Sequence, residues 1–182
     1  MLRNQQPRVA ENEFFPLIMK GSGNLKETID HLTEVVAINT RTADKLKTIH
    51  LSKYVDNAIV NVKGLVMQNT CSIRSYVEPD LKVMGIPAYI ESVVLNFLTN
   101  SIKYRSTKRE LEIKITAIEQ KDYIVLCFED NGLGIDLKAH GEKLFGLYKT
   151  FHGNDDARGV GLFITRNQIE AMGGTIKVES EL

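Results

Sequence analysis

The sequence has little cysteine, no net charge and no long apolar run, and each absence excludes a class of protein. Its 182 residues include two cysteines, Cys71 and Cys127, which lie in apolar surroundings without metal-ligand spacing. We therefore expect free thiols in a reducing, cytoplasmic compartment. Lys and Arg number 23, as do Asp and Glu, so the formal net charge is zero. That balance argues against a protein that binds nucleic acid or an anionic membrane through bulk charge.

No apolar stretch approaches the length of a membrane span. The longest uninterrupted run, Tyr123–Phe128, is far shorter than the roughly 20 residues that a spanning helix needs. Residues 1–20 also lack the apolar core of a secretory signal peptide. We expect a cytoplasmic domain, and this leaves open a membrane segment elsewhere in a longer parent protein.

The N-terminal part of the chain divides into two segments before the main domain. Residues 1–23 predict a poorly structured segment, because polar residues, prolines and the Gly21–Gly23 break interrupt any periodic pattern. Residues 24–44 predict a helix with a narrow apolar seam that extends over about two heptads. The seam residues are Leu25, Ile29, Leu32 and Val36. Such a helix needs a partner, so both a dimerisation helix and an ordinary core helix remain open.

Residues 45–182 alternate between helical and extended patterns, which predicts an α+β domain. The first half predicts an extended piece near Lys45–Leu51, a helix over Val55–Met67 and a strand from Cys71 towards Pro79. The second half predicts a helix over Pro87–Tyr104, a hairpin of Leu111–Ile118 and Tyr123–Glu129, a helix over Val160–Met172 and a last strand over Thr175–Glu179.

A polar stripe borders the apolar face of the helix predicted over Pro87–Tyr104. Asn96, Asn100 and Lys103 recur at i, i+4 and i+7, so they share one edge of that helix. An amide oxygen can bind Mg²⁺ without adding negative charge beside a triphosphate, and a lysine can contact phosphate oxygens. The stripe is thus either a solvated flank or a Mg²⁺–polyphosphate site, in which Tyr104 could lie against a base.

Two glycine-containing motifs follow. Asp130–Gly134 comes directly after a predicted strand and is either a turn or a carboxylate placed to accept a hydrogen bond from the adenine amine. Arg158–Leu162 precedes a predicted helix and is either a helix entry or a phosphate contact made by bare backbone N–H groups. Residues 136–157, between the two motifs, have the composition of a mobile lid.

In this order, the motifs resemble the catalytic domain of sensor histidine kinases. That family has four short sequence motifs, called boxes. In this chain the N box is resembled by Asn96–Tyr104, the G1 box by Asp130–Gly134, the F box by Lys143–Phe151 and the G2 box by Gly159–Leu162. The resemblance extends over Tyr54–Leu182, more than two thirds of the chain. It implies the Bergerat-type ATP-binding fold of gyrase, heat-shock chaperones, histidine kinases and mismatch-repair ATPases. That fold is a two-layer α/β sandwich with a mixed sheet under three helices, here preceded by a partial dimerisation helix.

The resemblance also implies roles for individual residues. Asn100 would be the Mg²⁺ ligand, with Asn96 near the phosphates and Lys103 in contact with them. The other phosphate contacts would come from the G2 box, through Arg158, Gly159 and Gly161. At the base, Tyr104 would pack on the ring, Asp130 would read the adenine amine, and Gly132 and Gly134 would line the pocket.

The sequence departs from the pattern of the family that it resembles in three places. Hydrolytic members of the superfamily have a Glu, the base for water, where this chain has Asn96, which favours a kinase. Ala157 stands where many relatives have the first of three glycines. A phosphoacceptor box, a His followed by an acidic or polar residue and then a Pro, is missing around all four histidines: His31, His50, His140 and His152.

We therefore predict the ATP-binding core of a two-component sensor histidine kinase, an ATP-dependent protein-histidine kinase that transfers the γ-phosphate of Mg·ATP to a histidine. The expected partners are ATP, a response regulator receiver domain and a second copy of the chain, bound through the helix at residues 24–44. The alternative is a nucleotide-sensing module that binds ATP without transferring phosphate.

Overall fold

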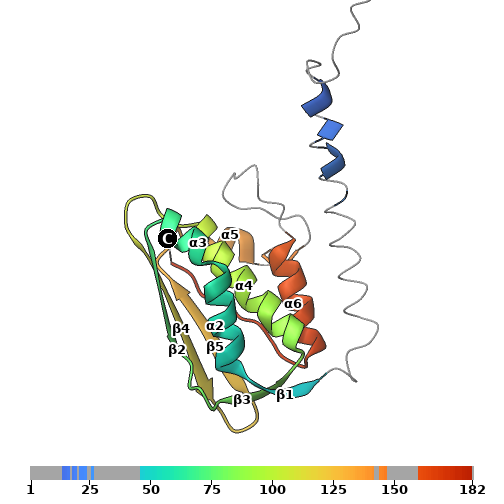
Figure 1. Ribbon diagram of the computed structural model, residues 1–182, viewed down its shortest axis with the longest axis vertical. Coiled ribbons are helices and arrows are strands. Elements are labelled where there is room, and N and C mark those ends of the chain that lie inside the picture. Colours follow the sequence, from blue (N-terminus) through green and yellow to red (C-terminus); the bar gives the residue numbers. More distant parts are fainter. Residues whose placement is uncertain are drawn as a thin grey trace, which may run out of the picture.

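The structure is a computed structural model, and it describes residues 46–141, 144–146 and 160–181. Within the N-terminal part it also describes residues 14–16, 18, 19, 21–23 and 26. The described region from residue 46 onwards has two layers, a sheet and a set of helices on one of its faces (Figure 1).

The main sheet is mixed and has three strands. β2 (Cys71–Tyr76) pairs in parallel with β4 (Leu111–Glu119), and β4 pairs in antiparallel with β5 (Ile124–Asp130). β4 is therefore the central strand, in the order β2-β4-β5. The β4–β5 pair confirms the predicted hairpin, and its turn is closed by a hydrogen bond from Gln120 N to Tyr123 O, 2.8 Å long.

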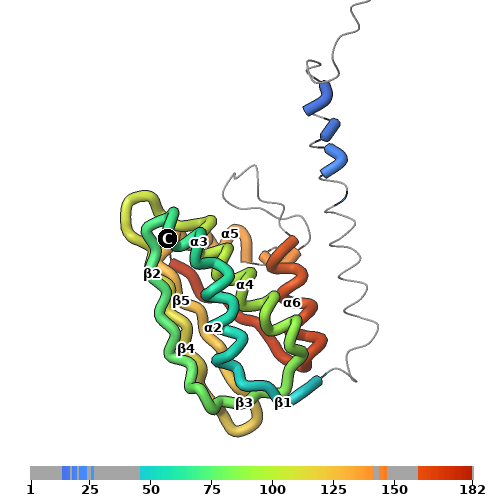
Figure 2. Tube along the Cα trace, in the orientation of Figure 1, coloured from blue at the N-terminus to red at the C-terminus, as the bar shows by residue number. Residues whose placement is uncertain are grey.

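Three helices form the second layer and lie side by side (Figure 2). They are α2 (Leu51–Asn61), α4 (Pro87–Lys103) and α6 (Gly161–Ala171), with α4 between the other two. Helices α2 and α4 contact strands of the sheet, and α6 packs against α4. The core lies between the layers, where alternate residues of β4 meet the helices. Its most buried members include Val55, Val94, Leu98, Ile113 and Ile115. The two-layer α/β sandwich implied by the resemblance is confirmed.

Smaller elements complete the domain. β1 (Lys47–His50) pairs in antiparallel with β3 (Lys82–Gly85). β1 corresponds to the predicted extended piece, whereas β3 was not predicted, because its four residues are too few to show a period. The helix predicted over Val55–Met67 is instead two, α2 and α3 (Lys63–Gln68), with Val62 between them. A short helix, α5 (Leu137–His140), begins after Asp136.

The prediction of a last strand at Thr175–Glu179 is wrong for the described residues. Residues 174–181 have no regular secondary structure, and no ladder pairs them with a described strand, although Ile176 and Val178 are half-buried between exposed neighbours. The alternating pattern therefore corresponds to alternating burial, and it implied a hydrogen-bonded partner that the described strands do not supply. Ser180 is held by its side chain instead, because its Oγ accepts a hydrogen bond from Ile135 N at 2.8 Å.

The N-terminal predictions fall mostly outside the described residues. In the segment expected to be poorly structured, the described residues 14–16, 18, 19 and 21–23 are helical. Glycine costs a helix only about 1 kcal/mol relative to alanine, so Gly21–Gly23 does not forbid one. Of the predicted dimerisation helix at residues 24–44, only Lys26 is described, and it is helical. No helix in the described part of the chain is long and apolar enough to cross a membrane.

Both cysteines are free thiols, as expected. Burial raises the pKa of Cys71, and Glu110 adds to the effect. Burial likewise raises the pKa of Cys127, with a further contribution from Glu129. Since the thiolate is the reactive form, both thiols should be slow nucleophiles near neutral pH.

We expect iodoacetamide to alkylate each thiol several-fold more slowly at pH 7.5 than in the urea-unfolded chain. The single-cysteine variants Cys71→Ser and Cys127→Ser separate the two rates, which mass spectrometry can follow over time. Both rates should rise with pH to a midpoint above that of the unfolded chain, because the folded pKa values are raised. Equal rates in the folded and unfolded chain would contradict this expectation.

Candidate functional site

Helix α4 carries the N-box residues and is well defined at both ends. It begins with Pro87 at its first turn, where the missing N–H costs no hydrogen bond, and ends at Lys103. Val93, Val94, Leu98, Ser101 and Ile102 form its buried face. The predicted polar stripe of Asn96, Asn100 and Lys103 lies beside that face, and all three residues are half-buried.

Two predicted phosphate-side residues contact each other. Asn100 Nδ2 donates a hydrogen bond to Asn96 Oδ1, 3.3 Å away, and Asn96 Nδ2 donates to Thr165 Oγ1 on α6. Gly161, the first residue of α6, lies against the same amide. A Cβ added to Gly161 would come within 2.6 Å of Asn96 Oδ1, so any other residue here would displace the Asn96 amide.

Asp130 lies at the end of β5, and two donors orient its carboxylate. Ser101 Oγ, from α4, donates to Asp130 Oδ2 at 2.8 Å, and Gly132 N donates to Asp130 Oδ1 at 2.9 Å. The residue is exposed, and each carboxylate oxygen has two lone pairs. The carboxylate is therefore held in a fixed orientation and can still accept a hydrogen bond from a ligand.

The loop after β5 is joined to the end of α4. Leu133 N donates to Tyr104 O at 3.0 Å, which brings the G1 box against the last residue of the N box. A Cβ on Gly132 would lie 2.7 Å from Asp130 Oδ1 and 2.9 Å from Tyr104 O, so this junction requires glycine. Gly134 has a φ of +71° and lies close to the carbonyl of Glu181. These contacts within the chain account for both glycines.

Lys103 and Tyr104 lie together at the C-terminal end of α4. Lys103 Nζ is 5.8 Å from the centre of the Tyr104 ring, within the range of a cation–π contact. Burial raises the pKa of Tyr104, so its phenol stays protonated at neutral pH. The pair thus presents a positive charge and an uncharged aromatic ring beside the Asp130 loop.

Arg109 and Asn131 fix the shape of that loop. The Arg109 guanidinium donates to the carbonyl oxygens of Asn131 and Gly132, at 2.6 and 2.5 Å. The Asn131 side chain joins the loop to the start of β4, because its Oδ1 accepts from Glu112 N at 2.9 Å and its Nδ2 donates to Glu110 O at 3.0 Å. These bonds hold the backbone next to Asp130 in one conformation.

Sequence reasoning missed three residues that build this site: Ser101, Arg109 and Thr165. A signal existed for two of them. Ser101 follows Leu98 by three positions, so it belongs to the buried face of α4, and a hydroxyl there needs a partner. Thr165 follows Gly161 by four positions, so the two share one face of the predicted helix, and the structure leaves Thr165 only 1% exposed. Arg109 is exposed beyond the end of a helix, and nothing in the sequence separates it from an ordinary surface arginine.

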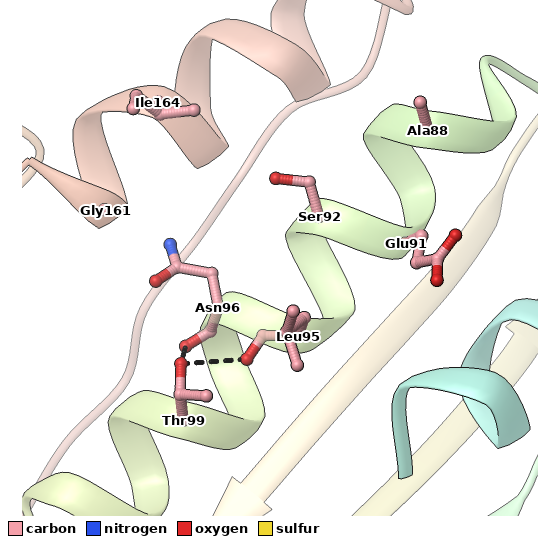
Figure 3. A pocket seen from close by; sticks show the side chains of 8 residues that line it. All are labelled: Ala88, Glu91, Ser92, Leu95, Asn96, Thr99, Gly161 and Ile164. Carbon is pink, nitrogen blue, oxygen red and sulfur yellow. Dashed lines mark hydrogen bonds between the residues drawn. The ribbon is translucent and has the colours of Figure 1, made fainter. Parts of the chain in front are cut away.

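A groove of about 470 Å³ runs between α4 and α6 (Figure 3). Ser92 and Asn96 extend into it from α4, and Gly161 and Ile164 border it from α6. Asn96 and Gly161 belong to the predicted phosphate side. The base-side residues do not line the groove, so the groove covers only one side of the predicted site.

The described residues fit Mg²⁺ bound together with phosphates better than Mg²⁺ bound by the protein alone. No cluster of three or more His, Cys, Asp or Glu side chains that could hold a metal occurs in the described ranges. Asn100 Nδ2 is used by Asn96, which leaves the amide oxygen, a suitable Mg²⁺ ligand, for another partner. Most ligands of a bound Mg²⁺ would therefore come from the nucleotide and water. Arg158 and Gly159, predicted at the phosphates, lie outside the described residues.

Known proteins with similar sequences include a phytochrome-like protein and a histidine kinase. The phytochrome-like protein Cph1 of Synechocystis sp. is 28% identical over 170 residues, which are 92% of this chain and 22% of that protein. The methanogenesis regulatory histidine kinase FilI of Methanothrix harundinacea is 37% identical over 92 residues, 50% of this chain and 10% of that protein. The chain thus spans less than a quarter of the length of either relative.

Among solved structures, a histidine kinase also has a similar fold. The Acinetobacter baumannii histidine kinase AdeS superposes with a TM-score of 0.72 at 19% identity, over 93% of this chain and 79% of that one. In the sequence, residues 85–182 match a single family, and this match includes α4, the β4–β5 hairpin and α6. It covers more than half of the chain, so the protein belongs to the histidine kinase-, DNA gyrase B-, and HSP90-like ATPases.

Proposed function

We propose that this chain is the ATP-binding core of a sensor histidine kinase and that it transfers the γ-phosphate of Mg·ATP to a histidine outside its own ATP-binding domain. One observation supports the proposal: a single helix, α4, carries residues proposed for both sides of a nucleotide site. Its edge presents the Asn96–Asn100 amide pair, and its C-terminal end meets the loop of Asp130.

The base side would select adenine. Asp130 accepts hydrogen bonds from Ser101 and Gly132 and keeps lone pairs for the exocyclic amine. Guanine has a carbonyl at that position, so two acceptors would face each other. An unpaired charged acceptor costs on the order of 1–3 kcal/mol or more, which would give a clear preference for ATP. Tyr104 would cover one face of the base, and Gly132 and Gly134 would line the edge of the pocket.

The phosphate side would position the triphosphate and neutralise its charge. Asn100 Oδ1 would ligate Mg²⁺, which supplies charge neutralisation for the phosphate oxygens. Lys103 would add a positive charge near them, and Asn96 and Gly161 would lie beside them. Arg158 and Gly159 would complete the contacts. Phosphoryl transfer needs alignment and electrostatic stabilisation more than covalent chemistry, so amides and a lysine suffice.

Transfer is favoured over hydrolysis by the identity of one side chain. The residue four positions before Asn100 is Asn96, whose amide is bonded to Thr165 and Asn100 and cannot remove a proton from water. The acceptor would be a histidine imidazole that docks at the γ-phosphate.

The remaining partners are proposed for the whole protein. Residues 24–44 would form part of a dimerisation helix, and residues 45–182 would be the catalytic domain. The phosphate would pass on to a response regulator receiver domain. The parent protein would keep this domain in the cytoplasm, with or without a membrane attachment of its own.

A nucleotide-sensing module is the second candidate. It is favoured by the histidines, because none of His31, His50, His140 and His152 lies in a phosphoacceptor pattern. Such a module would bind Mg·ATP and change its contacts without breaking the phosphate bond.

We expect this chain, incubated alone with γ-labelled ATP, to bind the nucleotide without labelling itself on histidine. Added to a separate dimerisation hairpin that contains an intact phosphoacceptor box, it should label that hairpin slowly. The label should be labile in acid and stable in alkali, as phosphohistidine is. The hairpin alone is the control.

The two candidates give different results in this assay. Binding of ATP with no label on any added hairpin supports the sensing module. An acid-labile label on the 182-residue chain itself would show that one of its own histidines is an acceptor.

A further inference from the structure

Polar side chains join α4 to α6 in an interface that helices usually fill with apolar residues. Thr165 and Gln168 of α6 are each 1% exposed. Gln168 Nε2 donates to Ser92 Oγ at 3.1 Å, and Thr165 Oγ1 accepts from Asn96 Nδ2. A buried polar pair of this kind fixes the relative position of two helices more tightly than apolar packing, because a small shift breaks its hydrogen bonds.

The contact of Thr165 continues to the proposed metal ligand. Asn96 uses Nδ2 for Thr165 and Oδ1 for Asn100 Nδ2, so its amide is tied at both ends. Asn100 in turn uses its only donor group on Asn96, which turns its Oδ1 away from this bond. A chain of two hydrogen bonds therefore runs from α6 through Asn96 to Asn100.

We propose that Thr165 is a positioning residue for the Mg²⁺ ligand Asn100 and acts through Asn96. This inference rests on the proposed role of Asn100. Without the Thr165 hydroxyl, the Asn96 amide loses the partner that sets its rotation and could present either end to Asn100. Asn100 would then no longer be held with its oxygen free. Partners that orient a metal ligand in this way typically change metal affinity by about 10–100-fold.

The link also ties metal binding to the position of α6. Thr165 lies four residues, about one helical turn, after Gly161, and Gly161 itself lies against Asn96. Any movement of the start of α6 would therefore change the contacts of the Asn96 side chain with Gly161 and Thr165. The affinity for Mg²⁺ in the nucleotide complex should thus report the position of this helix.

The experiment uses the full chain with the variants Thr165→Val, which removes the hydroxyl at nearly constant shape, and Thr165→Ser, which keeps it. Titration calorimetry measures binding of a non-hydrolysable ATP analogue over a series of Mg²⁺ concentrations, and binding of adenosine in EDTA. We expect Thr165→Val to weaken the Mg²⁺-dependent affinity about ten-fold, Thr165→Ser to restore it, and adenosine binding to remain unchanged.

Two further measurements isolate the path. In an Asn100→Ala background, Thr165→Val should have no additional effect, since the ligand that it positions is already gone. Thr116→Val, the same change on the sheet face that points away from the helices, is the matched control and should behave as wild type. If Thr165→Val unfolds the chain, Thr165→Ala takes its place, because a smaller side chain adds no methyl group near the Asn96 amide.

The outcomes separate this inference from the proposed function. Wild-type Mg²⁺ dependence in Thr165→Val, combined with its loss in Asn100→Ala, overturns the role of Thr165 and leaves that of Asn100 intact. An unchanged Mg²⁺ dependence in Asn100→Ala overturns the proposed metal site itself. An equal loss of adenosine and Mg²⁺–analogue binding in Thr165→Val shows a general structural defect and also overturns the inference.

Discussion

Replacing Asn100 with alanine is expected to weaken Mg²⁺-dependent binding of an ATP analogue by at least about 100-fold, more than the loss of an orienting partner does. The change removes the only side-chain oxygen proposed as a protein ligand of the metal. It also frees Asn96 Oδ1, which accepts from Asn100 Nδ2 at 3.3 Å. Titration calorimetry with and without Mg²⁺ measures the effect. The affinity in EDTA should change little, because the base-side contacts remain.

The stability of the variant should stay close to that of the wild type. Asn100 is half-buried on the polar edge of α4, and alanine is the best helix former, so the helix itself gains from the change. The matched control is Asn167→Ala on α6, whose side chain donates to the Phe163 carbonyl of its own helix. Asn167→Ala should keep the Mg²⁺ dependence of the wild type. Mg²⁺-dependent affinity that survives in Asn100→Ala would refute the assignment.

The parts of the fold that sequence predicts well are those with a strong local period. The predictions for the β4–β5 hairpin and for α4 agree with the structure to within one residue at every end, because their apolar residues alternate or recur over two or more turns. β3 was not predicted, because four residues are too few to show a hydrophobic period. Residues 174–181 show the opposite limit, since their burial alternates but no described strand pairs with them.

In the proposed site, too, residues in contiguous motifs can be predicted from the sequence, whereas partners far away in the sequence cannot. The resemblance predicts roles for Asp130, Asn100 and Tyr104 because their motifs are contiguous in the sequence. The residues that orient them are not contiguous with them: Ser101 lies 29 positions from Asp130, and Thr165 lies 69 positions from Asn96. A hydroxyl on a buried helix face indicates that some partner exists, but only the packed structure identifies the partner.

Asp130→Asn is expected to lower the affinity for ATP about 10–100-fold and to reduce the preference for ATP over GTP. A hydrogen bond to a charged group contributes about 1.5–3 kcal/mol, and each 1.4 kcal/mol corresponds to a factor of ten in affinity. Gly132 N can only donate, so the amide oxygen of the variant must stay on that side. The new NH₂ group then takes the side of Ser101, whose hydroxyl can accept as well as donate. The site gains a donor, which repels the adenine amine and suits the guanine carbonyl.

Two companion variants decide whether the effect belongs to this carboxylate. Ser101→Ala removes one of the two bonds that orient Asp130, so it should shift both affinity and selectivity in the same direction by a smaller factor. Asp136→Asn is the matched control, because Asp136 also accepts backbone N–H groups, from Lys138 and Ala139, and asparagine is an equally good cap. Its selectivity should equal that of the wild type. Equal binding of ATP and GTP by the wild-type chain would exclude Asp130 as the residue that reads the base, since a fixed acceptor cannot treat an amine and a carbonyl alike.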